Sequence, residues 1–179
     1  MCRDKSSTRK DGIGVAIFID GSRYDGGWKE GMSHGKGRLI RDNGSIYEGE
    51  WKEGKMHGKG LLKLNDGYTY DGEWEDGRME GHGIEKWNDG REYKGHFHYG
   101  KKDGKGKLVM DDASEYEGEF RDNSFNGNGR YKWSDGRIFN GEWLNGLMHG
   151  TGTLTWPDGR IYSGEFFENK KQGRGVFEW

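Results

Sequence analysis

The chain has almost no cysteine, proline or continuous apolar sequence, and each scarcity excludes a class of protein. Cys2 is the only cysteine among 179 residues, so no disulfide forms within the chain, which fits a reducing compartment. The single proline, Pro157, excludes a proline-rich linker. No apolar run approaches the length of a membrane-spanning helix, and the polar N-terminus predicts no signal peptide. We therefore expect a cytoplasmic protein.

Neither positive nor negative charge predominates in the chain. The chain has 29 basic and 31 acidic residues, interspersed, for a net charge of −2. No basic field favours nucleic acid, so we expect no nucleic-acid partner. Hydrophobic residues make up only 30%, too few for a thick core, yet aromatics reach 14% and glycine occupies 35 positions. This composition predicts a thin structure in which aromatic rings pack locally over glycines.

A strict internal repeat organises the sequence. A lead aromatic residue recurs every 23 residues without insertion or deletion, at Tyr24, Tyr47, Tyr70, Tyr93, Tyr116, Phe139 and Tyr162. A constant period of this size is the signature of a repeat architecture.

Each repeat predicts two strands. The first has the pattern Tyr-x-Gly-x-Trp, as in Tyr70, Gly72 and Trp74, and strand geometry places these three residues on one face. The second has the pattern Gly-x-Gly followed by alternating apolar residues, with breaks at Arg41 and Glu85. One apolar and one polar face are typical of an antiparallel sheet with one side in water.

Two turns join these strands, and both have the composition of a type I turn followed by a left-handed residue. Asn123 and Asn169 replace glycine in the first turn, and Ala113 replaces it in the second. We also expect the rings of Tyr47 and Trp51 to lie across Gly58 and Gly60 on the next strand.

The pattern Tyr-x-Gly-x-Trp-x-x-Gly-x-x-x-Gly-x-Gly, with Asp-Gly before the next tyrosine, resembles the MORN (membrane occupation and recognition nexus) repeat over residues 12–179. The departures are conservative: phenylalanine replaces the tryptophan at Phe97, Phe120 and Phe166, and the tyrosine at Phe139. The resemblance implies a non-catalytic protein. Such arrays serve as scaffolds in cytoskeletal and ciliary assemblies, as tethers at membrane contact sites and as appendages of lipid kinases, and some are reported to bind phosphoinositides.

The predicted fold is therefore all-β, an elongated single-layer antiparallel β-meander of 23-residue hairpin repeats. We expect a flexible tail at residues 1–11 and a repeat array at 12–179, which consists of a half repeat at 12–23 and seven full repeats that start at the lead aromatics.

Nothing in the sequence predicts an active site. No phosphate-binding glycine loop is present, and we expect no catalytic residue, no cofactor and no metal ion. His34, His57 and His149 fit hairpin positions. His96 and His98 share a strand face, but two histidines without a third ligand are more often structural or solvated.

Binding is the better prediction, because a single-layer sheet has no second layer to cover its aromatic face. We expect a partly exposed groove that accepts a peptide or helix of a protein partner. Its predicted lining is Tyr24, Trp28, Tyr47, Trp51, Tyr70, Trp74, Tyr93, Phe97, Tyr116, Phe120, Phe139, Trp143, Tyr162 and Phe166.

Two alternatives remain open. Basic turn tips such as Lys101 and Lys102 favour anionic lipid, although neighbouring acidic residues such as Asp103 oppose it. The terminal strands, Gly12–Phe18 and Gly173–Trp179, are free edges that invite strand addition or homo-oligomerisation. The lack of a cap after Trp179 fits a covering partner, a second copy, or a chain that is part of a longer protein.

Overall fold

In the computed structural model, the structure describes residues 11–179, and these residues form strands and turns without a helix. The predicted flexible tail lies outside the described residues except for residue 11. The chain divides into two compact units, the first ending at Arg78 and the second spanning Met79–Trp179.

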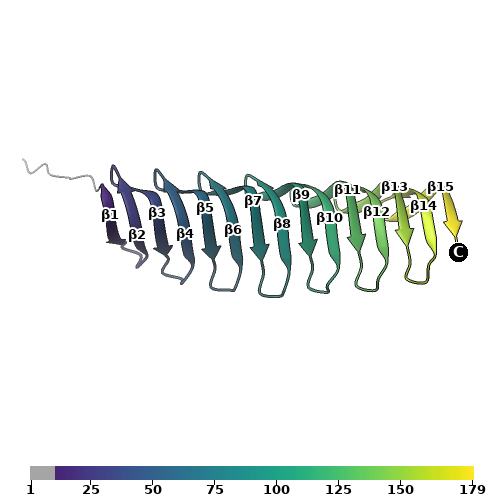
Figure 1. The fold of residues 1–179 in the computed structure, drawn as a ribbon, viewed down its shortest axis with the longest axis horizontal. Helices are drawn as coiled ribbons and strands as arrows, with labels where there is room; N and C mark the ends of the chain where they lie inside the picture. Colours follow the sequence, from purple (N-terminus) through teal and green to yellow (C-terminus); the bar gives the residue numbers. More distant parts are fainter. Residues whose placement is uncertain (1–10) are drawn as a thin grey trace, which may run out of the picture. The chain divides into compact units, whose positions relative to one another are not determined.

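Both units are open antiparallel meanders, in which the strands follow chain order without a crossover (Figure 1). The strands of the first unit are β1 (Gly12–Ile17), β2 (Arg23–Lys29), β3 (Met32–Ile40), β4 (Ile46–Lys52), β5 (Lys55–Lys63) and β6 (Thr69–Glu75). Those of the second unit are β7 (Arg78–Lys86, which begins one residue before it), β8 (Glu92–His98), β9 (Lys101–Val109), β10 (Glu115–Arg121), β11 (Ser124–Lys132), β12 (Ile138–Leu144), β13 (Leu147–Thr155), β14 (Ile161–Phe167) and β15 (Lys170–Glu178).

The predicted all-β fold of hairpin repeats in a single antiparallel layer is confirmed. The alternation of each first strand explains it, because successive side chains point to opposite faces of a sheet. In β4, Tyr47 and Trp51 are buried while Glu48 and Glu50 are exposed. We call the face that carries Tyr47 and Trp51, and its equivalent in the second unit, the aromatic face.

Within each unit, every hairpin that joins a first strand to the second strand of the same repeat contains a bulge that the sequence pattern did not predict. Gly49 of β4 pairs with Gly60 of β5, but the next residue, Glu50, pairs with His57, so Gly58 and Lys59 are extra on β5. Gly58 has a positive φ of 57°, which favours glycine because it lacks a side chain. The same shift follows Gly118, Gly141 and Gly164 in the second unit.

The first turn of the repeat differs from the prediction of a type I turn followed by a left-handed residue, which is wrong. Only Glu53 and Gly54 separate β4 from β5, and both have positive φ, 50° and 79°. Positive φ at both central residues defines a type I′ turn, whose twist matches that of the flanking strands. Asn123 and Asn169 hold the second position at φ 70° and 67°, as expected for the non-glycine residue that best tolerates this region.

The second turn confirms the prediction. The Gly67 N–H donates to the Leu64 carbonyl (3.2 Å), the Leu64 N–H donates to the Tyr68 carbonyl (2.8 Å), and Gly67 has a φ of 92°. This is a type I turn closed by a left-handed residue. Ala113 adopts φ 64° at the equivalent position, where a Cβ atom is strained.

The expected cover over the mid-strand glycines is half right. The Tyr47 ring lies directly over Gly60, where a Cβ atom would collide with the ring. Trp51, however, does not reach Gly58 on the next strand. Its indole Nε1 donates to the Gly37 carbonyl on the preceding strand β3 (3.1 Å), and a Cβ atom on Gly58 would meet the carboxylate of Glu50 instead.

Candidate functional site

The aromatic face is built on a ladder of rings that runs through each unit. In the first unit, Tyr24 packs edge-to-face on Trp28 of its own strand and on Trp51 of the next repeat, with ring centroids 5.0 and 5.2 Å apart. Tyr47 contacts Trp51 and Trp74 in the same way, at 5.1 and 5.3 Å. Edge-to-face geometry is favourable for aromatic pairs, so each repeat is joined to the next through rings.

The second unit continues the pattern with phenylalanine at several positions. Tyr93 packs on Phe97 and Phe120, at 5.1 and 5.0 Å, and Phe139 packs on Trp143 and Phe166, at 5.3 and 4.9 Å. The ring ladder therefore tolerates loss of the tyrosine hydroxyl or of the indole N–H.

Hydrogen bonds fix the polar atoms of these rings. The Tyr47 hydroxyl donates to the carbonyl of Glu50 at 3.0 Å, and the Tyr116 hydroxyl donates to that of Glu119 at 2.8 Å. Burial raises the pKa of both phenols above the usual value, so they remain protonated donors. Trp143 donates to the Gly129 carbonyl at 3.1 Å, as Trp51 does to Gly37.

The prediction that these rings form a partly exposed stripe is wrong. Thirteen of the fourteen predicted residues are buried, Trp28 being the exception with intermediate exposure; Tyr47 is 2% exposed and Trp74 is 5% exposed. The rings shield one another, and side chains of the second strands cover them. They form the core of each unit. The buried residues are Tyr24, Tyr47, Trp51, Tyr70, Trp74, Tyr93, Phe97, Tyr116, Phe120, Phe139, Trp143, Tyr162 and Phe166.

The accessible part of the aromatic face is a layer of second-strand side chains. Met56 stands opposite Trp51 and Leu62 stands opposite Tyr47 in the β4–β5 register. In the second unit, Phe125 stacks on the Tyr116 ring at 3.8 Å, and Tyr131 pairs with Tyr116 in the β10–β11 register. We call this half-buried set the outer layer: Leu39, Met56 and Leu62 in the first unit, and Leu108, Phe125, Tyr131, Trp133, Met148 and Trp156 in the second.

Sequence reasoning missed one column of the outer layer, the residue two positions after each type I′ turn. Met56, Phe125 and Met148 hold it, each opposite the Trp or Phe of the first strand. Apolar residues hold this column in four of the seven repeats, at Met56, Met79, Phe125 and Met148, and Ser33, Lys102 and Lys171 hold it in the other three. This partial recurrence at the 23-residue period is the signal that could have identified the column.

A buried ion pair interrupts the aromatic face in the second unit. Glu85, where the predicted alternation breaks, bonds to Lys102 of β9, and their side chains are only 7% and 14% exposed. The Lys102 ammonium also lies 4.9 Å from the Trp87 ring centre and 5.0 Å from that of Tyr93. Such cation–π contacts and the carboxylate together compensate the desolvated charge.

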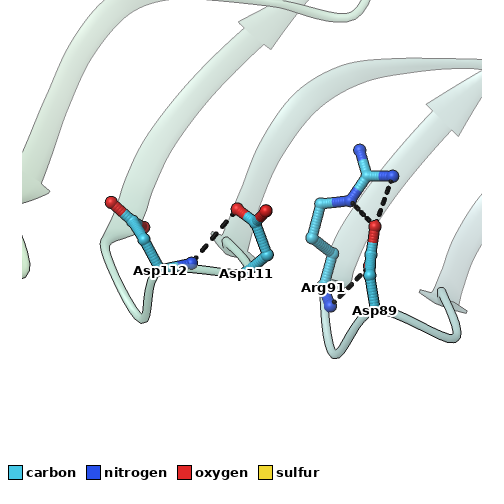
Figure 2. A network of polar contacts seen from close by, with 4 residues as sticks. All are labelled: Asp89, Arg91, Asp111 and Asp112. Atoms are coloured by element: carbon cyan, nitrogen blue, oxygen red, sulfur yellow. Dashed lines mark hydrogen bonds and ion pairs between the residues drawn. The ribbon is translucent and has the colours of Figure 1, made fainter.

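Three second turns of this unit share a tryptophan, aspartate and arginine. In the turn before β8, the Arg91 backbone N–H and Nε donate to the Asp89 carboxylate at 3.1 and 2.8 Å (Figure 2). The Arg91 guanidinium also lies 5.1 Å from the Trp87 ring centre. Arg137 and Arg160 repeat the arrangement. Figure 2 also shows Asp111 and Asp112 of the next such turn, where the Asp112 N–H donates to the Asp111 carboxylate. Ser114 stands there in place of the arginine, and its N–H donates to Asp112 at 2.9 Å.

A hollow of about 440 Å³ opens on the aromatic face of the first unit. Ser33 lies in it at the column where Met56 stands one repeat later, so a small side chain leaves the space open. Phe18, Trp28 and Arg41 line its rim. Arg41 is the other predicted break in the apolar alternation, and it gives this hollow a charged border.

A family comparison decides what these repeats are. The MORN repeat model matches seven segments, which cover most of the chain: residues 24–46, 47–67, 70–90, 93–113, 116–136, 139–159 and 162–179. The chain belongs to the MORN-repeat family. The lead aromatic residue of each MORN repeat is buried in the core, and so is the tryptophan or phenylalanine four residues later in every repeat but the first, where Trp28 is half-buried. The segment before the first match, residues 12–23, contributes β1.

The similarity of this MORN chain to individual proteins is weaker than its match to the family model. A comparison with curated protein sequences finds no significant match. The SAS-4 (dCPAP) TCP domain of Drosophila melanogaster, solved with a proline-rich motif of Ana2 (dSTIL), is 16% identical, with 87% of this chain and 90% of that chain covered and a TM-score of 0.47. The TCP10 domain of Danio rerio CPAP is 15% identical, with 90% and 98% covered and a TM-score of 0.29. These scores carry no inference about partners.

The described residues contain neither a standard metal-binding cluster nor a helix that could span a membrane. Within residues 11–179, no group of three or more His, Cys, Asp or Glu side chains could hold a metal ion, and no helix is long and apolar enough to cross a membrane. The two histidines that share a face take separate partners: His98 Nδ1 lies 2.8 Å from the Glu80 carboxylate, and the His96 ring contacts His82.

Proposed function

We propose that this MORN-repeat chain is a non-catalytic scaffold that binds a protein partner through the outer layer of its aromatic face. The observation that carries the proposal is the half-buried outer layer itself. It repeats along each unit, and the described residues supply no second layer over it. Contiguous apolar surface of this kind marks an interaction site.

The outer layer also has the chemistry of a protein-binding surface. Methionine and aromatic residues are enriched in interfaces, and Met56, Phe125, Tyr131 and Trp133 are of these types. Their backbone is held rigidly by the ring ladder beneath, which reduces the conformational entropy lost when a partner binds. A peptide or an amphipathic helix is the partner that best fits an open apolar face.

Affinity capture with quantitative mass spectrometry tests this proposal. The bait is the wild-type chain, and the test variant is Tyr131→Ser with Trp133→Ser, which removes two outer-layer rings but no buried ladder ring. The control is Arg130→Ser with Lys132→Ser on the opposite face of the same strand. We expect specific proteins to be lost with the first variant and retained with the second. Equal capture by a folded Tyr131→Ser/Trp133→Ser variant contradicts the proposal.

The cytoskeletal or ciliary setting expected from the MORN resemblance is part of this proposal. Imaging of the tagged chain in ciliated cells tests it, with the outer-layer variant as the control for partner-dependent placement. Diffuse signal for both proteins contradicts the setting and leaves the binding surface to the capture experiment.

Strand addition at β1 is a second candidate route, supported by exposure. Among the described residues β1 pairs only with β2, and Ile13 and Ile17 are 91% and 77% exposed. Exposed apolar edges favour pairing with another chain. Sedimentation of the wild-type chain and of an Ile13→Lys/Ile17→Lys variant measures this. Loss of self-association in the variant supports it, and a monomeric wild-type chain contradicts homo-oligomerisation at this edge.

Lipid binding receives less support. Lys55 at a turn tip pairs with Asp76 at 3.4 Å, and Lys101 pairs with Asp122 at 2.7 Å. Lipid recognition by basic residues relies on clustered, unopposed charge. Flotation with anionic vesicles separates the two functions, because salt-sensitive flotation of the wild-type chain would favour lipid.

A further inference from the structure

A pair of histidines faces solvent on the side of the sheet opposite the aromatic face in the second unit. His82 of β7 and His96 of β8 are cross-strand partners, and their ring centroids are 3.7 Å apart with an interplanar angle of 54°. His82 is exposed and His96 is half-buried. The rings are in contact but inclined to each other, so they are not a parallel stack.

The repeat shows how unusual this pair is. At the equivalent register position, β3, β5, β9, β11 and β13 each pair one residue with a glutamate of the following first strand, whereas in β1 Ile13 pairs with Gly27. The equivalent pairs are Lys36 with Glu50, Lys59 with Glu73, Lys105 with Glu119, Asn128 with Glu142, and Thr151 with Glu165. In three of these five pairs the charges are opposite and favourable across strands. At His82 and His96 both members have become histidine.

A structural role of the usual kind is lost with this replacement. The Glu142 carboxylate accepts hydrogen bonds from the Thr151 N–H at 3.0 Å and the Thr151 hydroxyl at 2.7 Å, so it ties its strand to the bulge of the next. Glu119 does the same for the Asn128 N–H at 3.4 Å. His96 contributes ring contact with His82 instead, which gives no carboxylate to the following strand.

We propose that His82 and His96 form a two-histidine site for a divalent transition metal of the Zn²⁺, Ni²⁺ or Cu²⁺ class. Imidazole nitrogen is a preferred ligand for these ions. Two nitrogens that bind one tetrahedral ion at about 2.0–2.1 Å lie roughly 3.3 Å from each other. His82 and His96 are direct cross-strand partners, and the Cβ atoms of such pairs lie about 4.5–5.5 Å apart. To bind one ion, the two rings, whose centroids are now 3.7 Å apart, have to rotate away from each other until one nitrogen of each faces the ion. Water fills the remaining positions, because the described residues 11–179 provide no group of three ligands.

Two carboxylates lie on the strands that carry and follow the pair. Glu80 precedes His82 by two residues on β7, and Asp103 follows on β9. Glu80 is already engaged by His98, whose Nδ1 lies 2.8 Å from the Glu80 carboxylate. A bound ion would connect β7 to β8 by their side chains, in addition to the ladder of backbone hydrogen bonds.

Calorimetric titration with ZnCl₂ or NiCl₂ in a non-chelating buffer tests the site. The variant His82→Lys/His96→Glu restores the oppositely charged pair of other repeats, so it is expected to fold. The control His149→Gln removes a histidine outside the pair and introduces the residue found one repeat later at Gln172. We expect one equivalent of metal on the wild-type chain and on the control, and affinity weaker by about tenfold or more in the double variant.

Two readouts decide the outcome. Metal should raise the melting temperature of the wild-type chain and not that of the double variant, because an ion that binds only the folded state stabilises it. Paramagnetic Ni²⁺ should broaden the imidazole resonances of His82 and His96 before those of the other four histidines. Unchanged affinity in the double variant, or first broadening elsewhere, overturns the site. The pair lies on the face opposite the outer layer, so this result is independent of partner binding.

Discussion

The indole of Trp51 donates a hydrogen bond of 3.1 Å to the carbonyl of Gly37 on the preceding strand. The same ring packs edge-to-face on Tyr24 of the preceding repeat, with centroids 5.2 Å apart. One side chain therefore links two repeats by a polar and an apolar contact, at a site that is buried.

Replacing Trp51 with phenylalanine should weaken the first unit without unfolding it. The variant loses the hydrogen bond and some ring area but keeps the ladder, as the natural phenylalanines Phe97 and Phe120 do. We expect a loss of about 1–2 kcal/mol in the free energy of unfolding, measured by urea denaturation. Trp51→Ala should cost about 3–5 kcal/mol. Equal losses for the two variants would show that ring packing is not the dominant contribution.

Substitution should destabilise the fold far more at Gly60 than at Gly54. A Cβ atom on Gly60 collides with the buried Tyr47 ring, whereas a Cβ atom on Gly54 meets no atom and is restricted only by its φ of 79°. We expect Gly60→Ala to destabilise the fold by about 3 kcal/mol. Gly54→Asn should change stability by less than about 1 kcal/mol, since asparagine tolerates positive φ. Thermal melting of both variants checks this, and a larger loss for Gly54→Asn would refute the packing account of Gly60.

Replacing Glu85 and Lys102 together should preserve stability, whereas replacing either residue alone should reduce it. The single variants Glu85→Leu and Lys102→Met each leave one buried charge, which costs about 3–5 kcal/mol. The double variant places at these positions the residue types found at Leu62 and Met56, so we expect stability equal to or above that of the wild-type chain. A double-mutant cycle measures the coupling. Additive losses would show that the two charges act independently.

The carboxylate of Glu142 should make stability depend on acid pH. The hydrogen bond from the Thr151 hydroxyl, aided by the Thr151 N–H, lowers the pKa of Glu142 below its ordinary 4.5. A lowered folded-state pKa contributes stability that is present above the unfolded value and lost as pH falls through the folded value. Urea midpoints of wild type and Glu142→Gln should therefore differ near neutral pH and converge in acid. A constant difference across pH would assign the loss to packing.

Much of the fold could be predicted because the repeat is strict. The constant spacing of Tyr24, Tyr47 and Tyr70 indicates register, and alternation around Tyr47 and Trp51 indicates which face is apolar. These signals suffice for an antiparallel meander, since a period of two and a fixed repeat length leave few other arrangements.

The turn type could not be read in the same way. Lys52-Glu53-Gly54 fits either a three-residue loop or a two-residue type I′ turn, and the choice depends on whether Lys52 pairs with Lys55. The bulge at Gly58 and Lys59 shifts the register by two residues and so brings Lys52 opposite Lys55. The same register shift occurs where Gly27 or His96 stands in the place of Glu50, so the residue type at this position does not signal the bulge.

The exposed surface was mispredicted for a related reason. The sequence distinguishes apolar from polar faces, but it does not show which apolar side chains lie on top. Met56 covers Trp51 only because of the register that the bulge creates. The candidate binding surface therefore consists of second-strand residues such as Leu62 and Tyr131, and not of the buried ring ladder that the sequence predicted.

Site-specific photo-crosslinking in a native extract tests the central claim, that the outer layer is the partner-binding surface, most directly. A benzophenone amino acid is placed at Leu62 or Tyr131 on the outer layer, and at Glu48 or Arg130 on the opposite face. We predict a discrete partner adduct from the first two positions and none from the second two. Adducts that form only from Glu48 or Arg130 would contradict the account.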